Sequence, residues 1–177
     1  NDSSMILYEL RQLGETTPED FREFEGLSAP LRWTTSRGLW RGVDDGNSGI
    51  AGLYSYGDDG SLGFLLNGNP VTATASFRND TGRTITALKI AYDAEQWRAF
   101  EGGRADTITA ETSIGGIRSP LPTLNFTADR SPGGNGPVPG GLSTTLSAEV
   151  PALSIAPGET FQLRFTATPG LPSGFME

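Results

Sequence analysis

Alternation between apolar and polar residues is the feature that most constrains the fold of this chain. The segments 71–78 (VTATASFR) and 84–92 (TITALKIAY) alternate in this way, and so do residues 142–150 and 161–166. A period of two places one side of a strand in a core and the other side in solvent. These segments therefore predict half-buried β-strands.

The connections between these strands predict an antiparallel arrangement. Gly (24) and Pro (12) are spread along the 177 residues, as expected for many turns between short strands. No helical crossover pattern separates the strands, which favours an antiparallel β-sandwich over a parallel α/β sheet. The sequence predicts an all-β fold, a jelly-roll-like antiparallel β-sandwich, in a single domain over residues 28–177.

The first 27 residues are predicted to form a lead-in to this domain. Thr17 precedes Pro18 and Glu19, which is a reasonable start for a short helix. An irregular segment, in which Phe21 and Phe24 close one end of the core, is an alternative that the sequence leaves open.

Composition excludes several classes of function. The chain has no cysteine and no histidine, so disulfides, thiol chemistry, histidine-ligated metals and a histidine-based triad are all excluded. The net charge of −8 disfavours nucleic acid as a partner. No run of 18 apolar residues is present, so we expect no membrane insertion, and the start of the sequence is that of a mature or trimmed chain.

Acidic side chains are the remaining candidates for catalysis. A glycoside hydrolase needs two carboxyl groups about 5 to 10 Å apart. The candidates are Asp44, Asp45, Asp58, Asp59, Glu95 and Glu101. Adjacent aspartates in glycine-rich stretches such as VDDGNSG and YGDDGS are usually solvated turn residues. A carboxylate-dependent glycan hydrolase or lyase is therefore the least favoured function, and no catalytic residue is predicted.

The same two acidic stretches are weak candidates for a calcium site. Calcium takes oxygen ligands from aspartate, asparagine and backbone carbonyls. Asp44, Asp45, Asp58 and Asp59 offer such oxygens, but no spaced glutamate closes either site. Calcium is the one cofactor that the sequence leaves open.

Aromatic residues would suggest carbohydrate binding if their rings were exposed, because such rings stack on sugar faces. The available large rings are Trp33, Trp40, Tyr54, Tyr56 and Trp97. Tyr54 and Tyr56 are two residues apart, so in a strand their side chains lie on the same face. A core or core-edge position is favoured for most of these residues, since a sandwich needs aromatic side chains inside.

The sequence Glu95-Gln96-Trp97-Arg98, at the end of a predicted strand, has two interpretations. In the structural one, Trp97 closes the core while Glu95 and Arg98 form an ion pair or satisfy backbone groups. In the functional one, Glu95 and Arg98 form a polar clamp for a ligand beside the ring of Trp97. The structural interpretation is favoured. In the functional one, Trp40 and Tyr56 complete the ligand-binding set.

Two glycine-rich connections are also informative. Residues 79–82 (NDTG) supply turn chemistry between two strands, which fits a hairpin or a tight sheet-to-sheet corner. Residues 131–141 (SPGGNGPVPGG) contain too much Gly and Pro for a regular element and predict a mobile surface loop.

Several stretches together carry a family resemblance. They are WTTSRGLWRGVDDGNSGIAGLYSYG (33–57), GSLGFLL (60–66), FRNDTGRTITALKIAYDAEQWR (77–98), LNFTADRS (124–131) and LSAEVPALSIAPGETFQLRF (146–165). The chain resembles a family of secreted bacterial β-sandwich modules that occur in exported proteins, often with a sorting signal, and beside extracellular nuclease or lamin-tail domains. The family pattern N-x-TG-x-TIT-x-L-x-I-x-Y-x-x-EQWR matches residues 79–98.

The resemblance implies a location and a role more than a reaction. It implies a secreted or cell-surface, non-catalytic structural, adhesive or accessory module, with other extracellular modules or copies of itself as partners. The alternative is a carbohydrate-binding module with a polysaccharide partner. Such modules usually continue with a final strand resembling LAIDDF, whereas this sequence reads GLPSGFME. We therefore expect a missing strand, supplied by a neighbouring copy or by residues 5–10 (MILYEL) of the chain itself.

Overall fold

The computed structural model describes residues 2–5, 32–36, 40–57, 61–99, 105–129 and 135–170, and these residues form an all-β structure. The strands are β1 (Asp2–Met5), β2 (Arg32–Thr35), β3 (Trp40–Asp44), β4 (Gly52–Tyr56), β5 (Ser61–Leu65), β6 (Val71–Arg78), β7 (Leu88–Ala99), β8 (Thr107–Ile114), β9 (Ile117–Pro120), β10 (Phe126–Thr127), β11 (Gly136–Val150) and β12 (Thr160–Thr168). One 3-10 turn, Pro122–Leu124, precedes β10. Over these ranges, no helix is long and apolar enough to cross a membrane.

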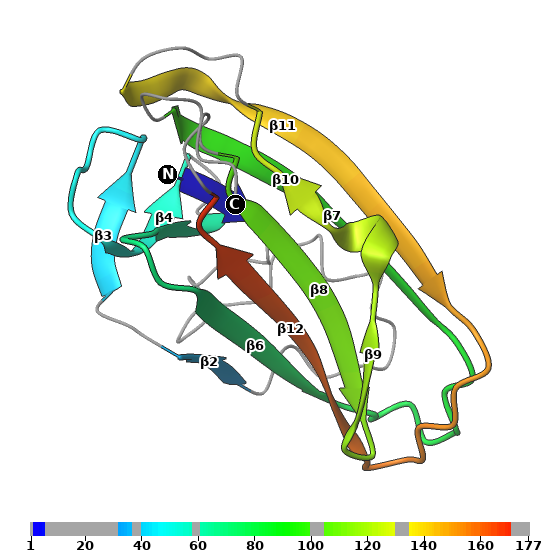
Figure 1. Ribbon diagram of the computed structural model, residues 1–177. Coiled ribbons are helices and arrows are strands. Elements are labelled where there is room, and N and C mark those ends of the chain that lie inside the picture. Colours follow the sequence, from blue (N-terminus) through cyan, green and yellow to red (C-terminus); the bar gives the residue numbers. More distant parts are fainter. Residues whose placement is uncertain are drawn as a thin grey trace.

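The strands form two sheets, which Figure 1 shows as separate layers. The first has the order β11-β7-β1-β5-β4-β3, and the second has the order β10-β8-β12-β6-β2, with β9 paired to β8. Neighbouring strands are antiparallel with one exception, the parallel pair β3 and β4. Because β3 and β4 run the same way, the connection 45–51 must bring the chain back to the level at which β3 begins.

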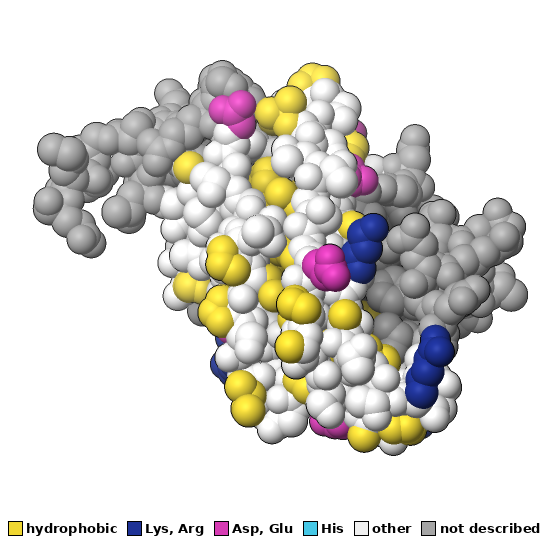
Figure 2. Space-filling view, turned by 90° about the vertical axis from the view of Figure 1, so that its right-hand side faces the viewer, with side chains coloured by type: hydrophobic (Ala, Val, Ile, Leu, Met, Phe, Trp, Pro, Cys, Tyr) yellow, Lys and Arg dark blue, Asp and Glu magenta, His cyan; other side chains and the backbone are white. Residues whose placement is uncertain are grey.

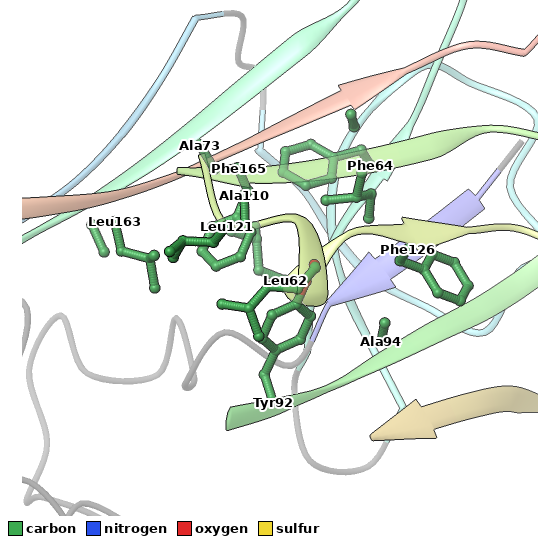
Figure 3. Close-up of a cluster of buried hydrophobic side chains, with 14 of the residues drawn as sticks. Leu62, Phe64, Ala73, Tyr92, Ala94, Ala110, Leu121, Phe126, Leu163 and Phe165 are labelled. Atoms are coloured by element: carbon green, nitrogen blue, oxygen red, sulfur yellow. The ribbon is translucent and has the colours of Figure 1, made fainter. Parts of the chain in front are cut away.

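Both sheets contribute side chains to one buried cluster, part of which is drawn in Figure 3. The predicted alternation is confirmed: residues 73, 75 and 77 of β6 and residues 161, 163 and 165 of β12 are buried, while their neighbours are not. Tyr92 of the first sheet meets Phe165 of the second edge to face, with ring centroids 5.4 Å apart. Its hydroxyl donates to the carbonyl of Leu124. Burial raises the pKa of Tyr92.

The connection between β6 and β7 is a sheet-to-sheet corner, which decides between the two predicted alternatives. β6 belongs to the second sheet and β7 to the first. Asn79, fully buried in this corner, donates from Nδ2 to the carbonyls of Arg83 and Ile155, both at 2.8 Å. Its Oδ1 accepts from the backbone N–H (3.0 Å) and the hydroxyl (2.7 Å) of Thr81.

A second crossing, from β11 to β12, runs beside this corner. Ile85 and Ile155 form a two-way backbone bridge at 2.9 and 3.1 Å, and Gly158 donates to the carbonyl of Asn79 at 2.7 Å. Asn79 therefore joins both crossings. The two crossings lie at one end of the molecule, the lower right of Figure 1.

The region around β11 departs from the sequence prediction. Residues 136–141, expected in a mobile loop, begin this 15-residue strand. Its Gly and Pro residues fit there because the pairing with β7 shifts register between Pro137 and Leu142. Leu142, expected in the core-facing set, is 40% exposed. Residues 131–134 lie outside the described residues.

The N-terminal lead-in also departs from expectation at its start. Asp2–Met5 is not a helix or an irregular segment but a strand, β1, between β7 and β5. Ser4 lies opposite Gly63 on one side and Glu95 on the other. Residues 6–27 and 171–177, which include the expected short helix and most of the MILYEL run, lie outside the described residues.

Exposed apolar side chains on the described surface are scattered. Val43 and Ile50, in β3 and the connection after it, are 79% and 60% exposed, and Ile117 of β9 is 73% exposed. The face drawn in Figure 2 has isolated apolar side chains among polar ones and few charged ones. Single exposed apolar residues of this kind are normal on protein surfaces.

Candidate functional site

The Glu95–Arg98 sequence lies near the end of β7, and its side chains are divided between the two faces of the sheet. Gln96 is 3% exposed and continues the core-facing set of Leu88, Tyr92 and Ala94. Glu95 and Trp97 lie on the opposite face. Both neighbouring strands are irregular here, because the pairing of β7 with β1 and with β11 shifts register next to Trp97. Such bulges re-aim side chains.

Trp97 belongs to a small aromatic cluster outside the main core. Its ring stacks on that of Tyr56, with the ring centroids 6.2 Å apart and an interplanar angle of 15°. The ring centroids of Tyr54 and Tyr56 are 5.7 Å apart. Tyr54 is 4% and Tyr56 0% exposed, and Leu65 packs with them. The predicted shared face of the two tyrosines is confirmed. Buried rings of this kind offer no open platform for a sugar.

Glu95 is hydrogen-bonded within this cluster. The indole Nε1 of Trp97 donates to its Oε2 at 2.7 Å, and the hydroxyl of Ser61 donates to the same oxygen at 3.4 Å. The carboxylate thus fixes the orientation of the indole and links β7 to β5.

Gln96 joins β7 to the segment after β10. Its Nε2 donates to the carbonyls of Arg98 (3.2 Å) and Asp129 (3.1 Å), and its Oε1 accepts the backbone N–H of Asp129 at 2.7 Å. A buried amide with both ends bonded is a stable structural link.

Arg98 has partners different from those of Glu95. Its Nη1 donates to the carbonyl of Gly46 at 2.7 Å, and its Nη2 donates to Oδ1 of Asn135 at 3.3 Å. The structure thus shows a guanidinium that satisfies a backbone carbonyl rather than an ion pair or clamp with Glu95.

Gly46 makes the contact with Arg98 possible. Its φ is +88°, and a Cβ at this position would lie 1.9 Å from the carbonyl oxygen of Trp97. Only glycine allows the 45–51 connection to approach the backbone of β7 so closely.

A cavity of about 260 Å³ lies beside Arg98. It is lined by Gly49, Ala51, Leu65, Leu66, Asn67, Arg98 and Asn135. Leu65 and Leu66 are buried, whereas Gly49, Asn67 and Asn135 are exposed. The cavity therefore has an apolar floor and a polar rim that carries one positive charge.

The predicted calcium ligands are only partly described. Asp44 accepts the backbone N–H of Ser48 at 3.0 Å, and Asp45 accepts the side-chain amide of Asn47 at 2.5 Å. These are bonds within one turn. Asp58 and Asp59 lie outside the described residues, and the rest of the structure holds no group of three or more acidic side chains that could bind a metal ion.

The structure brings together three of the five predicted ligand-binding residues, Glu95, Trp97 and Tyr56, and leaves Arg98 with a separate set of partners. Trp40 begins β3, opposite Leu53 of β4, but its side chain lies outside the described part, as do that of Trp33 and all of Glu101.

Sequence reasoning missed the residues that surround Arg98. Gly46, Asn67 and Asn135 come from three connections that are far apart in the sequence. In the sequence, each of these three residues has turn-forming neighbours, and such neighbours indicate a loop but not a site. The one usable signal was the Gly46 position after two aspartates, which is typical of a tight turn.

Comparisons with protein-family models, curated proteins and solved structures found no match to this chain. The site is therefore interpreted from its own geometry.

Proposed function

We propose that this chain is a non-catalytic structural or adhesive module of a larger secreted or cell-surface bacterial protein. The observation that carries the proposal is the use made of the Glu95–Arg98 side chains. Glu95, Gln96 and Arg98 each hydrogen-bond to another segment of the chain, and Trp97 donates to Glu95 and stacks on Tyr56 of β4. These contacts support an anchoring role for the four side chains.

An antiparallel β-sandwich of jelly-roll type is the proposed architecture. It is supported by the shared buried cluster of the two sheets and by the paired crossings beside Asn79. A core of this size gives a rigid scaffold without disulfides or metal. Secretion and a bacterial source rest on the family resemblance over about residues 18–177.

Self-assembly by strand exchange is part of the proposal. β1 is a four-residue strand in the interior of the first sheet, and 26 residues separate it from β2 in the other sheet. A short strand that many residues separate from the next described strand can be exchanged between copies without changing the pairing register. The proposed partners are therefore other copies or other extracellular modules.

Engineered disulfides test the exchange directly, because the chain has no cysteine. Ser4 lies opposite Gly63, so a Ser4→Cys/Gly63→Cys variant should oxidise readily. Strand exchange predicts covalent dimers and longer chains on non-reducing gels. Disulfide-linked monomers alone, at all protein concentrations, would show that each chain keeps its own β1.

The non-catalytic part of the proposal is tested by incubating the protein with a panel of acidic and neutral polysaccharides. We expect no new reducing ends and no unsaturated products over many hours. Turnover that disappears in the Glu95→Gln variant would instead support the hydrolase or lyase interpretation.

A further inference from the structure

We propose that the cavity beside Arg98 binds the carboxylate of a small ligand about the size of one sugar ring. This inference goes beyond the structural role proposed above and does not depend on it.

The first argument is the charge of Arg98. Its two hydrogen-bond acceptors, the carbonyl of Gly46 and the amide oxygen of Asn135, are both neutral. A guanidinium has five N–H donors, so donors remain for a ligand. Arg78, Arg118 and Arg164 all contact carboxylates, whereas Arg98 has no ion pair in the part of the chain that the structure describes. Guanidinium groups match carboxylates in geometry and charge.

The second argument is the composition of the cavity rim. Asn135 uses its oxygen to accept from Arg98, which leaves its amide nitrogen as a donor. Asn67, also on the rim, has a side chain without a hydrogen bond to any described residue. The two amides line the same cavity as the cation, and together these are donors suited to carboxylate and hydroxyl oxygens. Leu65 and Leu66 supply an apolar floor for the carbon atoms of a ring.

The size of the cavity limits the ligand. Pockets for drug-sized ligands have volumes of roughly 300–1,000 Å³. The volume here, about 260 Å³, is below that range and suits a single ring. Asp44 and Asp45 precede Gly46, whose carbonyl accepts from Arg98. These negative charges weaken anion binding, so we expect a Kd on the order of 1 mM, corresponding to roughly −4 kcal/mol.

Titration by NMR is suited to such affinities. Glucuronate is the probe, glucose is its neutral counterpart, and acetate carries the carboxylate without the ring. We expect glucuronate to shift the backbone amides of residues 49–51, 65–67 and 98, with glucose at least ten-fold weaker. Acetate binding as tightly as glucuronate would show that the site recognises the carboxylate alone, and it would refute the contribution of the ring. No saturable shifts with either anion would overturn the proposal.

Three variants separate binding from folding. Asn67→Asp places a carboxylate on the rim while leaving Arg98 and its two bonds in place, and it should weaken glucuronate binding at least ten-fold. Arg98→Gln should abolish binding, but it also removes the bond to Gly46. Arg118→Gln is the matched control, an exposed arginine on β9 of the other sheet. Equal glucuronate affinity in Asn67→Asp and in the unchanged protein would refute the site.

Discussion

The two ends of β7 are held by polar side chains in different ways. At its start, Asn79 is fully buried in the corner between the sheets and makes four hydrogen bonds with neutral partners inside the protein. Near its end, Arg98 is half-buried, has two neutral partners and lies beside a cavity. Figure 1 shows β7 running from the corner toward the opposite end of the molecule.

This comparison separates a structural polar residue from one that has capacity left for a ligand. Asn79 has one amide, and both its oxygen and its nitrogen are used twice, so nothing remains for a partner from outside. Arg98 carries a full charge that its neutral partners do not balance. A buried, satisfied amide fixes one geometry of the backbone, whereas a charged group at a cavity wall can gain a further bond when a ligand arrives.

The largest effect is expected for Asn79→Ala. The substitution leaves the carbonyl of Ile155 and the groups of the 79–83 turn without their buried partner, and each such loss costs about 1–3 kcal/mol. We expect the free energy of unfolding in urea to fall by about 4 kcal/mol.

Asn67→Ala is the matched control, because it removes an exposed amide from the cavity rim and should change stability by less than about 0.5 kcal/mol. A small effect at both positions would show that the corner does not depend on Asn79.

Gly46→Ala is expected to have the next largest effect. The added Cβ would lie 1.9 Å from the carbonyl oxygen of Trp97, and φ is +88°. The 45–51 connection must move away, which breaks the bond from Arg98 to Gly46. We expect a loss of about 3 kcal/mol in thermal or urea unfolding.

Gly42→Ala is the control for backbone strain alone, since φ there is +116° but no atom lies within 4 Å of the added Cβ. It should cost about 1–2 kcal/mol. Equal losses for the two glycines would mean that the close approach to β7 contributes nothing.

How far the sequence predicts these two regions depends on the range of the interactions. The alternation in 71–78 and 161–166 predicts the strands, because burial of one face is a local property of the pattern. The NDTG turn predicts the corner as one of two alternatives. The cavity beside Arg98 could not be predicted, because Gly49, Asn67 and Asn135 come from separate connections that meet only once the strands have paired. β1 was missed because DSSM is polar and has no strand pattern of its own.

A moderate effect is expected for Trp97→Ala. Deleting a fully buried large aromatic side chain lowers the free energy of unfolding by about 3–5 kcal/mol. Trp97 is only half-buried, but it covers one face of Tyr56. We therefore expect Trp97→Ala to lower the free energy of unfolding by about 2 kcal/mol. Trp97→Phe keeps the stacking and loses only the bond to Glu95, and it should cost about 1 kcal/mol. A loss of 4 kcal/mol or more for the alanine variant would place Trp97 with the core rather than at its edge.

The smallest effect is expected for Glu95→Gln, which distinguishes an anchoring carboxylate from one that needs its charge. The glutamine oxygen can still accept from the indole of Trp97, so the orientation of the ring is kept and stability should fall by about 0.5 kcal/mol or less. The indole N–H resonance of Trp97 should move only slightly, whereas Glu95→Ala removes the acceptor and should shift it strongly. Glucuronate binding at Arg98 should be the same in both variants, because the described hydrogen bonds of Glu95 and of Arg98 go to different residues. Loss of glucuronate binding in Glu95→Gln would show that Glu95 and Arg98 act as one ligand clamp. It would contradict separate roles for the two residues, an anchoring role for Glu95 and ligand binding for Arg98.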